Sequence, residues 1–287
     1  MSGRTAFVLA GGGSLGAVQV GMLKALARNG VVPDLVVGAS VGAINAAYFA
    51  AVPSAEGVAR LERVWLGLKS ADVFPLSPLN SLLAIFGKRD HLVSPAHLRA
   101  LLESELPCER IEQAKIPCYV VATDVLEGTE VCLSSGPLAP ALLASAAIPA
   151  LFPSVSIDGR HLIDGGVANN TPISSAVKLG ASRIIVLATG LSCALEEPPR
   201  GAVALALHAV NLLVMHQLLS DIEHFSSRAE IIVVPPLCPV TVSSYDFSQT
   251  ADLVHRAEAK TRLWLQQKGL QRVGAPDELS PHEHETH

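Results

Sequence analysis

Short apolar runs and longer segments with helical periodicity alternate along most of this chain. Residues 5–10 and 34–37 are the first two runs, and each leads through a glycine-rich turn into a segment whose apolar residues recur at helical spacing. Strands that alternate with helices in this way usually pair in parallel and bury the helices against both faces of one sheet. The pattern therefore predicts an α/β fold with a mostly parallel central sheet.

The later elements follow from the same pattern. Helices are expected over residues 54–69, 95–105, 172–179, 202–219 and 248–268, and strands over 116–125, 129–135, 183–188 and 230–236. Asp158-Gly159 lies between two short apolar runs, which is a hairpin signal. We expect a single domain over residues 5–270 and a polar, disordered tail over 271–287.

Residues 70–95 interrupt this regularity. The stretch contains three prolines and an apolar cluster at 82–86. An ordinary connection with a short buried helix fits this composition, and a lid or acyl-chain wall over a functional site fits it as well.

The composition narrows the class of protein. Of 287 residues 49% are hydrophobic, which is enough for a sizeable core, and the net charge of −5 gives no electrostatic basis for binding nucleic acid. The five cysteines are scattered and lack C-x-x-C spacing, which favours reduced thiols and a cytoplasmic protein over zinc or disulfides. The N-terminal apolar run is too short for a signal peptide.

The first candidate for chemistry is Ser40, in the sequence Gly38-Ala39-Ser40-Val41-Gly42. A G-x-S-x-G turn between a strand and a helix presents its serine above the sheet edge, where the hydroxyl can act as a nucleophile. The flanking glycines, Gly38 and Gly42, leave room for strand and helix to approach. The alternative is a glycine-rich turn with an idle serine.

The preceding turn, Gly11-Gly12-Gly13-Ser14-Leu15-Gly16, supplies backbone N–H groups at a helix N-terminus. An acyl-transfer enzyme needs such donors for the oxyanion of its tetrahedral intermediate. The G-x-G-x-x-G spacing also fits a dinucleotide-binding fingerprint, which requires an acidic residue at the end of the second strand. The only candidate, Asp34, lies at the start of that strand instead, which disfavours a dinucleotide.

Asp164, in Asp164-Gly165-Gly166, is the second candidate. A carboxylate at the end of a strand can reach a neighbouring loop and act as the general base for a serine. Asp124 and Asp158 are rival acids. The histidines that follow Asp164 lack a turn context, and His208, His216 and His224 recur every eight residues within one helical stretch. A Ser–Asp dyad is therefore favoured over a Ser–His–Asp triad.

Taken in order, G-G-G-x-x-G at 11–16, G-x-S-x-G at 38–42 and D-G-G at 164–166 resemble the patatin-like phospholipase family. The segment from Ser145 to Pro153 resembles that family as well. The resemblance implies a three-layer fold and a metal-free, cofactor-free acyl hydrolase for lipid esters, of phospholipase A, lysophospholipase or esterase type. It implies Ser40 as nucleophile, Asp164 as base, and an oxyanion hole from the backbone of Gly11, Gly12 and Gly13.

Two positions depart from the family pattern. Leu15 stands where many members carry Arg or Lys, and Ala10 stands where many carry Asp. Because the oxyanion donors are backbone groups, we expect catalysis to survive, but the lost cation weakens the case for a phosphate-bearing substrate. The remaining alternatives are a catalytically idle lipid-binding module and a dinucleotide-binding protein that uses Gly11–Gly16.

Residues 202–219 contain no Asp, Glu, Lys or Arg, and the run borders on the length of a transmembrane segment. His208, Asn211, His216 and Gln217 interrupt it. A buried helix, a helix packed against a second subunit over 202–226, and a surface that faces lipid all remain open. The expected partners are a lipid or acyl-ester substrate and a transient membrane surface.

Overall fold

The computed structural model describes residues 3–74, 91–190 and 201–279. Within these ranges one mixed sheet contains β1 (Arg4–Leu9), β2 (Leu35–Ala39), β3 (Cys118–Asp124), β4 (Glu130–Leu133), β5 (Val155–Ile157), β6 (Arg160–Asp164), β7 (Ala181–Leu187) and β8 (Glu230–Val234). The α-helices are α1 (Gly16–Arg28), α2 (Val41–Ala51), α3 (Ala55–Gly67), α4 (Ser70–Val73), α6 (Ala96–Glu105), α7 (Leu138–Ser145), α8 (Gly166–Asn169), α9 (Ile173–Lys178), α10 (Ala202–Phe225) and α11 (Thr250–Gln266). The 3₁₀ turns are η1 (Gly13–Leu15), η2 (Ile111–Gln113), η3 (Gly269–Gln271) and η4 (Asp277–Leu279).

The sheet has the order β5-β6-β3-β2-β1-β7-β8, and β4 also pairs with β3. The strands from β3 to β8 in this order are parallel to one another, whereas β4, β5 and β6 run antiparallel to their neighbours. This arrangement confirms the predicted α/β class and the mostly parallel sheet. The hairpin predicted at Asp158-Gly159 is also present, between β5 and β6.

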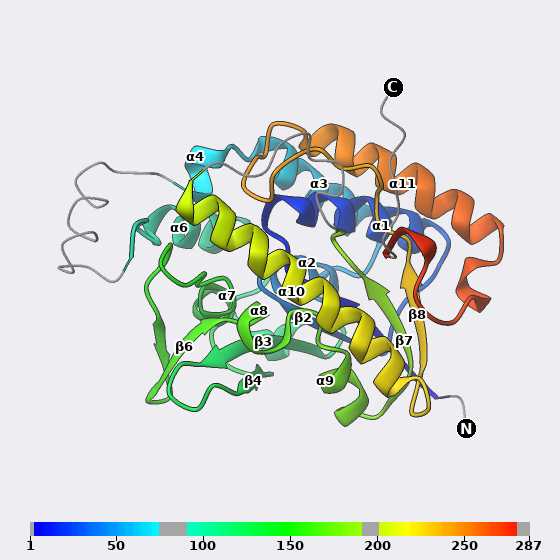
Figure 1. The fold of residues 1–287 in the computed structure, drawn as a ribbon, viewed down its shortest axis with the longest axis horizontal. Helices are drawn as coiled ribbons and strands as arrows, with labels where there is room; N and C mark the ends of the chain where they lie inside the picture. The colour runs from blue at the N-terminus through cyan, green and yellow to red at the C-terminus, as the bar shows by residue number, and fades with distance from the viewer. Residues whose placement is uncertain (1–2, 75–90, 191–200, 280–287) are drawn as a thin grey trace.

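Helices cover both faces of the sheet and form three layers (Figure 1). Phe7 and Leu9 of β1 point to one face, where they pack with α1, α2 and α11. Ala6 and Val8 of the same strand point to the other face and pack with α9 and the C-terminal half of α10. Alternate side chains of a strand point to opposite faces, so a strand that is apolar at every position is covered on both sides.

One expectation from the sequence needs correction, and another concerns residues that lie mostly outside the described parts of the chain. Residues 271–279 are ordered rather than disordered, because Gly274 donates a backbone hydrogen bond to Ile231 of β8 and the Leu279 side chain is buried. The suggested lid over 70–95 lies mostly outside the described residues, which include only α4 at its start and 91–95 at its end.

Candidate active site

A sharp turn connects β2 to α2 and contains Ser40. The backbone of Ser40 has φ 54° and ψ −130°, a conformation that is costly for a residue with a β-carbon. A β-carbon at Gly38 would overlap the carbonyl group of Gly42, and one at Gly42 would overlap the carbonyl group of Leu9. Glycine at both positions therefore lets strand and helix approach closely, and Ser40 lies at the N-terminus of α2, where the helix dipole favours negative charge.

Asp164 ends β6 directly beside Ser40. Ala39 at the end of β2 pairs with Val121 of β3, and Asp164 pairs with the next residue of β3. β4 pairs both with the part of β3 that contacts β2 and with the part that contacts β6. β4 therefore occupies one edge of β3, and β2 and β6 lie one after the other along the opposite edge. β2 and β6 run in opposite directions along that edge, so their carboxyl ends meet. There the Ser40 Oγ donates a hydrogen bond of 2.7 Å to Asp164 Oδ2.

The Asp164 carboxylate is buried, and it accepts a second hydrogen bond. The Gly166 N–H donates to Oδ1 at 2.7 Å, and the Thr123 hydroxyl donates to the backbone carbonyl of Asp164 at 2.8 Å. Burial raises the pKa of this carboxyl to about 6, although the hydrogen bonds from Ser40 and Gly166 lower it. A carboxylate with a pKa near neutrality in contact with a serine hydroxyl has the properties of a general base.

Ser145, at the end of α7, fixes the position of the Ser40 turn. The Ser40 N–H donates to Ser145 Oγ at 2.9 Å, and the Ser145 hydroxyl donates to the Val121 carbonyl at 2.5 Å. The sequence indicates Ser145 only as part of a segment that resembles the family, and it gives no role for this side chain or for Thr123. Both roles arise from contacts between distant parts of the chain.

The first glycine-rich turn lies above Ser40, and its amides differ in their partners. The Gly11 N–H donates to the Asn170 carbonyl at 3.1 Å, and the Ser14 N–H donates to the Ser244 carbonyl at 2.8 Å. The N–H groups of Gly12 and Gly13 make no hydrogen bond with any part of the chain that the structure describes. Gly12 and Gly13 therefore offer donors to a bound group beside Ser40, whereas the Gly11 donor is occupied.

A chain of buried amide side chains supports this turn from below. Gln19 of α1 donates to the Ala10 carbonyl at 2.7 Å, and Asn45 of α2 donates to Gln19 Oε1 at 2.9 Å and to the Gly16 carbonyl at 3.0 Å. The Trp65 indole N–H then donates to Asn45 Oδ1 at 2.9 Å. Gln19 and Asn45 are fully buried, so this network fixes both ends of the glycine-rich turn.

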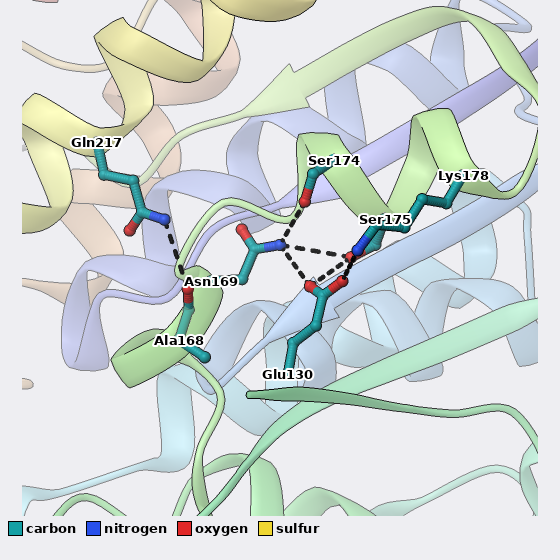
Figure 2. Close-up of polar contacts among 7 residues, drawn as sticks. All are labelled: Glu130, Ala168, Asn169, Ser174, Ser175, Lys178 and Gln217. Carbon is teal, nitrogen blue, oxygen red and sulfur yellow. Dashed lines mark hydrogen bonds and ion pairs between the residues drawn. The ribbon is translucent and has the colours of Figure 1, made fainter. Parts of the chain in front are cut away.

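A second polar cluster holds α8, the short helix that follows Asp164 (Figure 2). The Asn169 side-chain amide donates to Glu130 Oε2 at 2.6 Å, and Glu130 also accepts from Ser175 at 2.8 Å and from Lys178 at 2.5 Å. Partial burial acts to raise the pKa of Glu130, but these hydrogen bonds outweigh it and hold that pKa below its ordinary value. From α10, Gln217 donates to a backbone carbonyl of α8 at 3.4 Å.

Two cavities meet at Ser40. The first is almost entirely apolar, and its walls include Ile44, Tyr48, Leu61, Trp65, Leu102 and Phe247. The second is more polar and is bounded by the glycine-rich turn, Asp164, Asn170, Val210 and Tyr245. A serine between an apolar and a polar cavity can hold a substrate with one apolar arm and one polar arm.

The rival acids have other roles. Asp124 Oδ1 accepts the N–H groups of Leu126 and Glu127 in the turn after β3. Asp158 lies at the hairpin tip with φ 49°. Asp34, the acid considered for a dinucleotide site, accepts the Thr5 N–H at 2.7 Å at the opposite end of the strands. Among the described residues, no histidine forms a hydrogen bond with Ser40 Oγ or with the Asp164 carboxylate.

The uncharged run that begins at residue 202 forms the first part of α10. The C-terminal half of α10 packs against the sheet through Leu218 and Ile222. Its N-terminal half exposes Leu205, Leu212 and Leu213. Within the described residues, no helix combines the length and apolar character needed to cross a bilayer.

Comparisons with known proteins agree with the motifs. The family model for patatin-like phospholipase matches residues 7–177. An uncharacterized NTE family protein of Mycobacterium bovis is 30% identical over 205 residues, which cover 70% of this chain and 52% of that protein. The human patatin-like phospholipase domain-containing protein 6 is 30% identical over 199 residues, which cover 66% of this chain and 14% of that protein. The chain thus spans about half or less of these relatives.

A solved structure shares the fold. Human GIVD cytosolic phospholipase A2, in complex with a methyl gamma-linolenyl fluorophosphonate inhibitor and terbium chloride, aligns with a TM-score of 0.51 and 15% identity over 94% of this chain and 59% of that chain. At this identity the likeness supports the fold alone.

Proposed function

Since the chain belongs to the patatin-like phospholipase family, we propose that it hydrolyses carboxylic esters of lipids through Ser40 and Asp164. The hydrogen bond of 2.7 Å between Ser40 Oγ and Asp164 Oδ2 carries this proposal. It joins a strained, nucleophile-type serine to a buried carboxylate whose pKa is raised to about 6. At neutral pH that carboxylate is mostly ionised and can accept the serine proton.

The reaction proceeds in two steps. Asp164 takes the Ser40 proton while Oγ attacks the ester carbonyl carbon, and the resulting tetrahedral intermediate carries its negative charge on the former carbonyl oxygen. When the intermediate collapses, the C–O bond to the alcohol breaks and Asp164 returns the proton to the alcohol. A water molecule then attacks the acyl-enzyme, Asp164 takes the water proton, and the proton passes back to Ser40 as the fatty acid leaves.

The oxyanion is assigned to the N–H groups of Gly12 and Gly13. These are the two glycine amides of the turn without a hydrogen-bond partner in the described parts of the chain. Both glycines line the polar cavity together with Ser40 and Asp164. The Gly11 amide, expected from the sequence to share this role, is engaged by Asn170 and is assigned to holding the turn in place. Each oxyanion donor contributes roughly 100- to 1,000-fold in rate.

The two cavities suggest how the substrate lies. The acyl chain occupies the apolar cavity, because transferring methylene groups from water to apolar surface is favourable. The alcohol or head group occupies the polar cavity beside Asp164, the group that returns the proton to the leaving oxygen. This orientation needs no metal ion and no cofactor.

The test is hydrolysis of p-nitrophenyl acyl esters by wild-type, Ser40→Ala and Asp164→Asn proteins, with folding checked by circular dichroism. Ser40→Ala and Asp164→Asn should each lower kcat by at least roughly 10⁴-fold. Ser156→Ala, an exposed serine on β5, is the matched control and should retain wild-type activity. An active Ser40→Ala protein would overturn the proposal. An inactive wild type whose Ser40 also resists an organophosphonate would favour the lipid-binding alternative.

We also propose that the N-terminal half of α10 touches the lipid surface from which substrate enters. Leu205 and Leu213 are 54% and 67% exposed, and Val210 of the same half lines the polar cavity. In the C-terminal half the outward positions are polar, namely Ser220, Glu223 and His224. The exposed apolar side chains of the helix therefore lie in the part beside the site. Because that part carries no charged residue, it suits a neutral membrane surface.

Sedimentation with phosphatidylcholine vesicles tests this contact. A Leu205→Ser/Leu213→Ser variant should lose vesicle binding while it keeps activity on a water-soluble ester. Leu263→Ser, on α11, is the matched control, because Leu263 is also 54% exposed but lies away from the site. If the double variant instead changes the sedimentation coefficient of the free protein and leaves vesicle binding intact, the helix joins two copies of the chain.

A further inference from the structure

The apolar cavity extends along one face of α2, starting at Ser40. The cavity-lining residues of this helix are Val41, Ile44 and Tyr48. Residues at these spacings of three and four share one side of a helix, so they form a continuous wall. The wall begins beside the nucleophile and extends to the last lining position of the helix, Tyr48.

The neighbouring helix α3 provides independent evidence for the direction in which the cavity extends. A β-carbon at Gly16 would touch both Val41 and Trp65, so Trp65 lies near the Ser40 end of the wall. Leu61, one turn earlier on α3, also lines the cavity. A β-carbon at Gly57, near the start of α3, would overlap the backbone carbonyl of Val52, which follows the last residue of α2, so the start of α3 lies near the far end of the wall. The two helices are therefore antiparallel along the cavity.

The far end differs in chemistry from the rest of the cavity. Tyr48 is buried, and Glu105, the solvent-exposed last residue of α6, lines the cavity with it. Burial raises the pKa of the Tyr48 phenol and the Glu105 carboxylate raises it further, while Arg60 and Arg63 act in the opposite direction. An acyl chain that passed this point would have to displace an aromatic ring and bring methylene groups against a carboxylate, which is unfavourable.

The geometry of α2 gives the length of this wall. Eight residues separate Ser40 from Tyr48, and at about 1.5 Å per residue the wall is about 12 Å long. An extended chain of single bonds advances about 1.2 Å per bond, as the reach of about 3.6 Å per three-bond residue shows. The wall therefore matches an acyl chain of about ten carbons.

We propose that Tyr48 closes the acyl cavity and limits the preferred acyl chain to about ten carbons, so that the substrates are esters of medium-chain fatty acids. This inference rests on the proposed function, because it needs an acyl group attached to Ser40. It assigns Tyr48 as the residue that determines chain length, with Glu105 as the polar group that disfavours longer chains.

The test compares p-nitrophenyl butanoate, octanoate, decanoate, tetradecanoate and hexadecanoate, each below its critical micelle concentration. In the wild type, kcat/KM should rise to a maximum at octanoate or decanoate and fall for the two longest esters. Tyr48→Ala should raise kcat/KM for tetradecanoate relative to decanoate by at least roughly tenfold, since each further buried methylene contributes about fourfold and burial of two of the four extra methylenes is enough. Tyr48→Phe keeps the ring and should keep the wild-type profile.

A variant at the middle of the wall provides the opposite shift. Ile44→Trp should move the maximum to butanoate, because the larger side chain fills the cavity between Val41 and Tyr48. Rates of Ser40 labelling by alkyl fluorophosphonates of the same chain lengths, measured by mass spectrometry, should follow the same profiles without depending on turnover.

The outcomes separate the two proposals. A maximum at hexadecanoate in the wild type, or a profile that neither Tyr48→Ala nor Ile44→Trp changes, overturns the assignment of Tyr48 and leaves the hydrolase intact. A wild type that hydrolyses none of the esters and resists every fluorophosphonate overturns the proposed function itself.

Discussion

Ser40 and Asp164 lie at the carboxyl ends of two strands that meet head to head along the same edge of β3. Their registers on β3 are consecutive, because Ala39 pairs with Val121 and Asp164 pairs with Ala122. In a purely parallel sheet all strands end on the same side of the sheet, so their carboxyl ends lie side by side. Here an antiparallel strand arrives from the opposite direction, and the hydrogen bond of 2.7 Å closes the gap between the two strand ends.

The pH dependence of hydrolysis should report Asp164. Its pKa is raised to about 6 by burial, and only the ionised carboxylate can accept a proton. We expect kcat/KM to be half-maximal near pH 6 and to fall about tenfold per pH unit below that, with the product followed at a pH-independent wavelength. A profile that is flat from pH 7 down to pH 4 would exclude this carboxylate as the base.

The same raised pKa predicts a pH-dependent stability. The pKa of Asp164 is above its unfolded value of 3.8, so the native state binds the proton more tightly and stability falls as pH rises between about 4 and 6. Asp164→Asn removes the buried charge and should stabilise the fold at pH 7 by up to about 3 kcal/mol, because a pKa difference of one between the folded and unfolded states corresponds to about 1.4 kcal/mol. The gain should vanish below about pH 4, as denaturant unfolding at both pH values can show.

The Glu130 cluster should influence catalysis without touching the substrate. Glu130→Ala removes the acceptor of Asn169 and loosens α8, which carries the Gly166 N–H that binds Asp164. We expect kcat to fall roughly tenfold with KM nearly unchanged. The midpoint of the pH profile should move upward, because the carboxylate loses part of a hydrogen bond that lowers its pKa.

Two further variants distinguish positioning from stability in that experiment. Glu130→Gln keeps an acceptor oxygen and should restore most of kcat. Glu127→Ala removes an exposed glutamate near the same strand and should behave as wild type. If Glu130→Ala lowers only the melting temperature and leaves the pH midpoint in place, the cluster is purely structural.

Asn45 should matter for the fold as much as for the glycine-rich turn. Asn45→Ala leaves the Gln19 Oε1 and the Trp65 N–H without partners in a buried site. Each unsatisfied buried group costs about 1–3 kcal/mol, so we expect a loss of about 2–6 kcal/mol in the free energy of unfolding. Asn29→Ala, at the C-cap of α1 and exposed, should cost less than about 1 kcal/mol in the same denaturant titration.

Local patterns carry the features that the sequence predicts well. Glycines around Ser40 are required by close backbone approach, and the strand before and the helix after it are visible as periodicity. The hairpin at Asp158-Gly159 has its turn residues in sequence. The family resemblance is confirmed by the match over residues 7–177. The cytoplasmic location suggested by the cysteines stays a prediction.

Contacts between distant segments explain what the sequence does not reveal. Ser145 meets Ser40 across 105 residues, and Glu130 meets Asn169 across 39. No periodicity marks such side chains, because their partners depend on how the strands are ordered. The order of the segment after residue 270 is not predictable from the sequence for a related reason. The stretch is mostly polar, and one buried apolar residue, Leu279, anchors it.

The helix α8 has a consequence for how this site can change over evolutionary time. One end of it supplies the Gly166 N–H to the base, and the residue just past its other end, Asn170, accepts the Gly11 N–H of the glycine-rich turn. In the proposed mechanism, a substitution that displaces this four-residue segment moves the proton acceptor and the oxyanion donors together. Proton transfer and charge stabilisation would then change as one trait, whereas a substitution in the cavity walls would leave both in place.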